Sequence, residues 1–170
     1  MFKKGLILFV ISFTVVFVSC RNNQLNKTDQ QHKAAFVEVI KILDGGNLDD
    51  LDNYIAEDAV DHQLDTSMTS KTGLEGIKEM FKGYQKIFPD MKTTIHSIAV
   101  SGDTLFAFIT SVGTAAEPFM GMPAGYVSSN SSVDVLVFEG DKMKEHWGFM
   151  DMSEVMKMMQ QMPMMEGMDQ

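Results

Sequence analysis

Apolar residues in the first half of the chain recur at helical spacing. From His32 onward they predict a helix that ends at Gly45-Gly46, with Phe36, Val39, Ile40 and Leu43 on one face. Asn47 is typical of an N-cap and predicts a short second helix. The third helix follows a 3-4-3-4 spacing and ends before Pro89, with Leu74, Ile77, Phe81, Tyr84 and Phe88 facing inward.

The second half alternates between apolar and polar residues, as strands do. After a short strand at Ala59–Gln63, it predicts four strands at residues 92–100, 104–115, 127–138 and 143–150. The segments "SGD", "EPFMGMPAG" and "EGDK" separate these four strands and are typical of turns. Helices followed by a run of antiparallel strands and a short closing helix predict an α+β domain.

The last predicted strand, "EHWGFMD" (Glu145 to Asp151), concentrates the candidate chemistry. It holds the only Trp and one of the four His of the chain. Alternation places Glu145, Trp147, Phe149 and Asp151 on one face, and Lys144, His146, Gly148 and Met150 on the other. We therefore expect one face of this strand to pack and the other to meet a pocket or solvent.

The N-terminus has the features of a signal peptide. Lys3 and Lys4 precede the apolar run Leu6 to Val18, which is shorter than the roughly 20 residues of a spanning helix. Ser19 precedes the only Cys, as in a bacterial lipoprotein signal. The sequence thus predicts a signal peptide at 1–19, then acylated Cys20 and a flexible tether to residue 31, and an extracytoplasmic protein anchored to the membrane of a bacterial cell envelope.

Composition excludes some classes of partner and ligand. The formal net charge of −9 argues against nucleic-acid binding, which needs a basic surface. A lone Cys and four scattered His do not form a metal-ligand spacing, so neither a metal nor another cofactor is expected. The end of the chain is rich in Met, and thioethers bind soft Cu(I), so the tail at residues 162–170 carries an alternative hypothesis of copper binding.

Four segments in order resemble the SnoaL-like polyketide cyclase and ester cyclase family. They are "IAEDAVDHQ", "GLEGIKEMFKGYQKIFPDM", "GTAAEPFMGMPAG" and "VDVLVFEGDKMKEHWGFMD". The resemblance implies a domain at 32–161 with the nuclear transport factor 2-like fold: a curved antiparallel sheet, wrapped into a cone by three N-terminal helices and a short C-terminal helix. It also implies an internal pocket.

The resemblance implies a different chemistry from that of the family's cyclases. Their acid/base Asp corresponds to Gly148, and an assisting His corresponds to Asp134. Another His corresponds to Ala115, and an Arg to Phe108. Because Gly cannot exchange a proton, the expected function is binding of a small, largely apolar molecule rather than the family's cyclisation.

The candidate pocket residues come from four of the predicted strands and from the loop "EPFMGMPAG". If both face the pocket, His146 and Asp134 form an acid/base pair, since a carboxylate raises the pKa of an imidazole and fixes its tautomer. Otherwise His146 is a sheet residue bonded to the backbone and Asp134 a charge in water. The expected ligand-binding residues are His62, Phe106, Phe108, Phe119, Met122 and Trp147.

Three functions therefore remain open besides simple ligand binding. They are a cyclase or hydrolase-type enzyme using His146 and Asp134, a non-catalytic protein-interaction module, and Cu(I) binding by the tail. A homodimer formed through an exposed sheet face is a further expectation.

Overall fold

The structure, a computed structural model, describes residues 27–161. The predicted signal peptide, Cys20, most of the predicted tether and the Met-rich tail lie outside these residues. In chain order the elements are α1 (Lys27–Leu43), the 3-10 helix η1 (Leu48–Asn53), β1 (Ile55–Asp61), α2 (Gly73–Ile87), β2 (Lys92–Ser101), β3 (Thr104–Thr114), β4 (Val127–Glu139), β5 (Lys142–Met150) and α3 (Met152–Gln161).

The helices form where the apolar spacing predicts them, and the first one begins earlier than predicted. α1 begins at Lys27, so residues 27–31 belong to a helix and the predicted tether is too long. His32, where the predicted helix begins, is buried and stacks on Phe138 of β4. The second predicted helix is the short η1, which Asn47 caps by accepting a hydrogen bond from the Asp49 amide.

Five strands form one mixed sheet in the order β1-β5-β4-β3-β2. The four strands β2 to β5 are antiparallel, and their bounds lie within one residue of the prediction. β1 runs parallel to β5, which corrects the expectation of a purely antiparallel sheet. β1 also covers Ile55–Asp61 rather than Ala59–Gln63.

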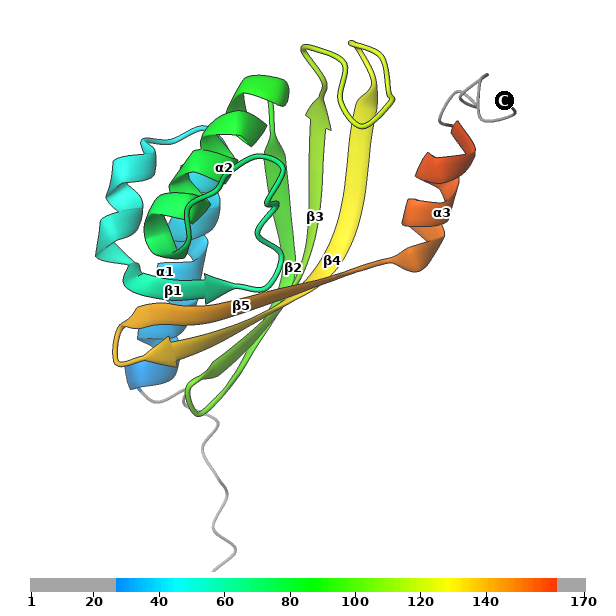
Figure 1. Cartoon of the computed structure of the whole chain (residues 1–170). Coiled ribbons are helices and arrows are strands. Elements are labelled where there is room, and N and C mark those ends of the chain that lie inside the picture. Colours follow the sequence, from blue (N-terminus) through cyan, green and yellow to red (C-terminus); the bar gives the residue numbers. More distant parts are fainter. Residues whose placement is uncertain (1–26, 162–170) are drawn as a thin grey trace, which may run out of the picture.

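The sheet curves around the helices, as the predicted cone requires. Register shifts interrupt the pairing of β2 with β3 and of β4 with β5, and such bulges bend a strand. Figure 1 shows α1 and α2 on one side of the sheet and α3 on the other. The core lies between the first two helices and the sheet and includes Phe36, Val39, Leu51, Ile77, Leu105 and Leu136. Within residues 27–161, no helix has the length and apolar character needed to cross a membrane.

Candidate active site

A cavity of about 320 Å³ opens between the helices and the curved face of the sheet. Its walls are mainly apolar. α1 contributes Phe36, Val39, Ile40 and Leu43, α2 contributes Ile77, Phe81 and Tyr84, and the strands contribute Ile109, Leu136, Met143 and Met150. A site of this kind suits a small apolar molecule that a few polar groups orient.

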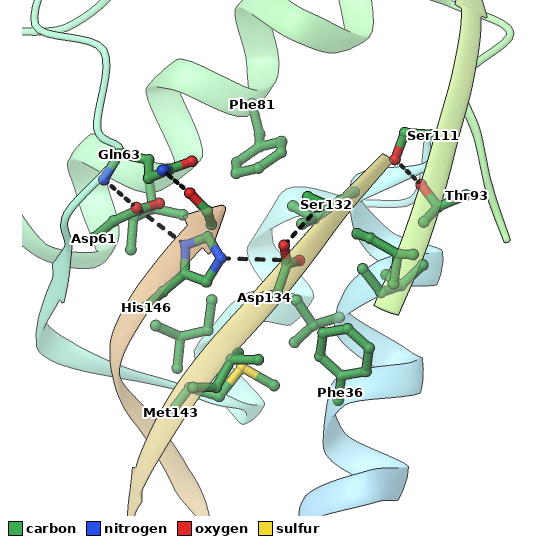
Figure 2. A pocket seen from close by; sticks show the side chains of 18 of the residues that line it. Phe36, Asp61, Gln63, Phe81, Thr93, Ser111, Ser132, Asp134, Met143 and His146 are labelled. Carbon is green, nitrogen blue, oxygen red and sulfur yellow. Dashed lines mark hydrogen bonds and ion pairs between the residues drawn. The ribbon is translucent and has the colours of Figure 1, made fainter. Parts of the chain in front are cut away.

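The polar part of the wall centres on His146, which lies between two carboxylates (Figure 2). The Nδ1 atom of His146 lies 3.1 Å from Oδ1 of Asp61 on β1, within hydrogen-bond distance. The Nε2 atom lies 3.9 Å from Oδ2 of Asp134, which is an ion-pair distance but too long for a direct hydrogen bond. The other oxygen of Asp134 accepts a hydrogen bond of 2.8 Å from the Ser132 hydroxyl.

Strand register explains why these residues meet. β5 lies between β1 and β4, with Asp61 opposite His146 and Asp134 opposite Gly148. His146 and Asp134 are therefore diagonal neighbours on one face of adjacent strands, close enough for long side chains to interact. The backbone amide of Gln63 also donates to Oδ1 of Asp61 at 2.8 Å, which holds the carboxylate toward the imidazole.

Burial and charge shift the pKa values of both facing groups. Burial raises the pKa of the Asp134 carboxyl, against the opposing effects of His146 and of the Ser132 hydroxyl. Burial by itself lowers the pKa of His146, but the hydrogen bond and charge of Asp61, with the charge of Asp134, outweigh it and leave this pKa raised. Shifted groups facing each other in a cavity are typical of acid/base sites.

A second polar group lines the cavity on β2 and β3. The Thr93 hydroxyl lies 2.7 Å from Oδ1 of Asp44 and 2.9 Å from the Ser111 hydroxyl. The Thr93 amide donates to the other oxygen of Asp44 at 2.7 Å. These hydroxyls are already hydrogen-bonded to protein, so they add polarity to the wall without leaving an unpaired charge there.

The Gln63 side chain fills the space beside Gly148 on the cavity wall. The Gln63 side chain donates from Nε2 to the Gly148 carbonyl and lies against the glycine. A Cβ atom at residue 148 would come within 2.6 Å of Oε1 of Gln63 and 3.6 Å of Oδ1 of Asp134. Gln63 therefore occupies the space that a side chain at position 148 would enter.

The structure brings His146 and Asp134 together in the cavity, but none of the six predicted ligand-binding residues lines it. Phe106 and Phe108 lie on the opposite face of β3, where both are more than 40% exposed, because the odd-numbered Ile109 and Ser111 face the cavity. Trp147 lies outside for the same reason, since its neighbours His146 and Gly148 face inward.

The other three predicted residues lie beside or beyond the cavity wall. His62 stacks on Trp147 on the outer side, with ring centroids 4.2 Å apart, and its Nε2 lies 3.1 Å from Glu145. Phe119 packs edge-on against Tyr84 and Phe88, behind the wall. Met122 is buried in the loop after β3, where its backbone pairs with that of Phe119. Assigning these six residues to the cavity lining was wrong.

Sequence reasoning missed Asp61 and Gln63, which flank the chosen His62. The signal that could have found them is alternation along "AVDHQ": if His62 faces outward, both of its neighbours face inward. Phe81, one of the inward-facing residues predicted on α2, packs against the core and also lines the cavity. Among residues 27–161, no cluster of three or more His, Cys, Asp and Glu side chains is arranged to hold a metal ion.

Comparisons with solved structures show the fold. TsrD from Streptomyces laurentii superposes with a TM-score of 0.66 at 20% identity, over 79% of this chain and 96% of that one. IdmH from Streptomyces antibioticus gives 0.65 at 24% identity, over 76% and 99%. A SnoaL-like polyketide cyclase from Agrobacterium tumefaciens gives 0.62 at 16% identity, over 75% and 97%.

No curated protein sequence matches this chain. The family model described as SnoaL-like polyketide cyclase matches residues 31–161, which include all strands and nearly all of the helices described above. The α+β cone and its cavity agree with that match. The chain therefore belongs to the SnoaL-like polyketide cyclase family.

Proposed function

We propose that this protein binds a small, uncharged, largely apolar molecule in the cone cavity and catalyses a proton transfer on it with His146 and Asp134. The observation that carries this proposal is the placement of His146 between Asp61 and Asp134 on the wall of an apolar cavity. The family's usual cyclisation is not the proposed reaction, because Gly148 has no acid/base group.

The two carboxylates act differently on the imidazole. Asp61 accepts the Nδ1 proton of His146 and so fixes the tautomer whose Nε2 is a free base. Asp134 is too far from Nε2 for a direct hydrogen bond, so both groups keep capacity for a bound molecule. His146 then accepts a proton from the ligand and returns it at another atom of the same molecule, and Asp134, 3.9 Å from Nε2, stabilises the imidazolium that forms in between.

The charges of the cavity favour an uncharged ligand. Four Asp and Glu residues contribute to the lining, namely Asp44, Asp61, Asp134 and Glu145. The single Lys of the lining, Lys144, is paired with Asp58. An anionic ligand would therefore meet negative charge without a free lysine to balance it, whereas a neutral apolar molecule gains from the apolar walls.

The test uses 5-nitrobenzisoxazole, a small neutral molecule whose ring opens when a base removes a proton from carbon. We expect the protein to accelerate this reaction, and His146→Ala to reduce the rate by about 10²–10⁴-fold, as the loss of a positioned base does. His62→Ala is the matched control, since His62 is exposed and lies outside the cavity.

Asp134→Asn and aromatic polyketide esters complete the experiment. Asp134→Asn keeps the shape of the side chain and should change the pH profile of the reaction. Equal rates for wild type and His146→Ala would refute the acid/base role. Turnover of aromatic polyketide esters that both substitutions abolish would show that the pair performs the family's reaction from a relocated position.

A further inference from the structure

The cavity has a second polar group at a distance from His146. Alternate residues of β4 face the cavity, among them Asn130 and Asp134. Four residues of an antiparallel strand span about 14 Å, so Asn130 lies far along the wall from Asp134. Asn130 pairs with Ser111 of β3, and Ser111 pairs with Thr93 of β2. These three residues all line the cavity and cross three adjacent strands, and we call them the distal row.

The hydroxyl protons of the distal row are directed to protein acceptors. The Thr93 hydroxyl donates to Oδ1 of Asp44 at 2.7 Å. The Thr93 and Ser111 hydroxyl oxygens lie 2.9 Å apart (Figure 2), and since the Thr93 proton points to the carboxylate, Ser111 is the donor in this contact. The Ser111 oxygen then has a lone pair left and no proton, so it can accept a hydrogen bond from a ligand but cannot donate one.

Asn130 keeps free hydrogen-bonding capacity of both kinds. Its Nδ2 atom donates one hydrogen bond, to the Ser128 hydroxyl at 2.8 Å, and a side-chain amide also has a second N–H and a carbonyl oxygen. In the part of the chain that the structure describes, Nδ1 of His32 is the single buried side-chain nitrogen or oxygen without a partner. The Oδ1 atom of Asn130, which has no partner there either, is therefore open to the cavity or to solvent. Asn130 thus offers one donor and one acceptor beside the acceptor of Ser111.

We propose that the distal row binds a hydroxyl group, so that the ligand is an elongated, uncharged alcohol or phenol whose reacting C–H lies at the other end. This inference rests on the proposed function and names the substrate class of the same site. A hydroxyl donates to Ser111 or to Oδ1 of Asn130 and accepts from the free Asn130 N–H. A ketone or an ether only accepts, and a charged group would lose its hydration against the apolar walls.

Binding at both ends of the cavity gives the distal row its effect on the reaction. Apolar walls hold a molecule without fixing which of its ends meets His146, whereas a hydrogen bond at one end fixes its direction. A hydroxyl held at Asn130 places the opposite end of the molecule beside Nε2 of His146, where proton transfer requires contact. Asn130 and Ser111 are therefore specificity residues, and His146 remains the base.

Equilibrium dialysis of the full-length protein, in one detergent solution throughout, tests the hydroxyl site with three rod-shaped probes. The probes are 4-hydroxybiphenyl, 4-methoxybiphenyl and biphenyl, which share an apolar body and differ in the group at one end. We expect wild type to bind 4-hydroxybiphenyl about 3–10-fold more tightly than 4-methoxybiphenyl, as one net hydrogen bond gives. Asn130→Leu should abolish this preference and leave the Kd of biphenyl unchanged. Ser129→Leu is the matched control, since Ser129 is exposed and lies outside the cavity lining.

Equal affinity of wild type for the hydroxyl and methoxy probes, or a preference that persists in folded Asn130→Leu, would overturn the hydroxyl site. Circular dichroism verifies the fold, and Ser111→Ala decides in the same way if Asn130→Leu does not fold. His146→Ala should keep the preference, so failure of the acid/base role alone leaves this result unchanged. Equal binding of all three probes would remove the hydroxyl site and leave the apolar cavity and the base in place, whereas no binding of any probe would contradict both proposals.

Discussion

At the scale of single residues, His146 is the group whose surroundings have the clearest consequences. It pairs with a buried carboxylate on one nitrogen and faces a second across a gap of 3.9 Å. Gly148 lies two residues further along β5 and faces the same side of the sheet. It lacks the acid that the family's cyclases have at this position, and the Gln63 side chain lies against it. The acid/base chemistry proposed for the cavity thus depends on the side chains of Asp61 on β1, Asp134 on β4 and His146 on β5.

The raised pKa of His146 predicts how folding stability depends on pH. Because the folded protein holds this proton more tightly than an unfolded chain with a pKa near 6.5, the stabilisation is fully present below pH 6.5. It is lost as the pH rises through the folded-state value. We expect the difference in unfolding free energy between wild type and His146→Gln to shrink as the pH rises above 6.5, measured by urea denaturation.

His62→Gln is the control for this measurement. His62 is exposed, and its contacts are a stacked Trp147 and an exposed Glu145. Its substitution should change stability little at any pH, since exposed ion pairs contribute about 0–1 kcal/mol. If the difference in unfolding free energy between wild type and His146→Gln grows with pH, the pairing with Asp61 does not stabilise the protonated imidazole of His146.

Gly148→Asp should not create a working cyclase. The new side chain would displace Gln63 and bring a carboxylate beside Asp134, where like charges oppose ionisation. Phe108 and Ala115, the positions that the resemblance matches to the supporting Arg and His, do not line the cavity, so they cannot assist the new acid. We expect no turnover of aromatic polyketide esters by Gly148→Asp, and a lower melting temperature than wild type.

The double variant Gln63→Ala/Gly148→Asp tests whether lack of space or the added charge lowers the melting temperature of Gly148→Asp. If lack of space causes the destabilisation, removing the Gln63 side chain restores part of the melting temperature. Gln63→Ala alone is the matched control. Turnover by either variant that carries Asp at 148 would show that the supporting groups are dispensable.

At the scale of elements, α2 contributes side chains both to the core and to the cavity wall, and its apolar spacing does not show how deeply each one is buried. Its apolar spacing gives Ile77 and Phe81 equivalent inward positions. Both side chains reach the cavity wall, but Ile77 is only 6% exposed and belongs to the core, whereas Phe81 is half-buried and packs at the edge of the core. Apolar residues that face a cavity are available to a ligand, but they pack against fewer protein atoms.

Ile77→Ala should therefore destabilise the protein more than Phe81→Ala. We expect about 2–5 kcal/mol for Ile77→Ala, the usual range for such a buried truncation. Phe81→Ala should cost less, because its ring is only half-buried in the folded protein. Urea denaturation measures both, and a larger loss for Phe81→Ala would place its ring in the core and not at the site.

At the scale of the whole molecule, the domain has the cone fold of the SnoaL-like family. The proposed location in the cell envelope depends on residues outside this domain. We propose that Cys20 is acylated and anchors the protein in the cell envelope, on the basis of Lys3, Lys4, the apolar run from Leu6 to Val18, and Ser19. Two acyl signals give stable anchoring, whereas one chain binds a membrane only marginally.

Cys20→Ala should release the protein from the membrane fraction or leave it as an unprocessed precursor. Fractionation of producing cells and intact-mass measurement of the protein provide the two readouts. Ser19→Ala, which keeps a small residue before the Cys, is the control and should remain anchored. A wild-type protein recovered soluble with a free Cys20 thiol would remove the lipid anchor from this account.

The sequence by itself determined the class of fold and the bounds of most elements. Helical spacing and strand alternation reflect burial on one face, so residues 92–150 divide into strands nearly as observed. The resemblance to a family added the cone and the pairing of His146 with Asp134 on one wall. Local patterns could not show that β1 is parallel to β5, since the partner of a strand is chosen by contacts far along the chain.

Only the tertiary structure decided which side chains face the cavity. Phe106, Phe108 and Trp147 are as apolar as residues that line a pocket, but each lies one residue out of phase with the cavity-facing set. A shift of one residue moves a side chain to the other face of a sheet, and composition does not report that shift. Asp61 and Gln63 join the site because β1 lies beside β5, a contact 85 residues apart in the chain.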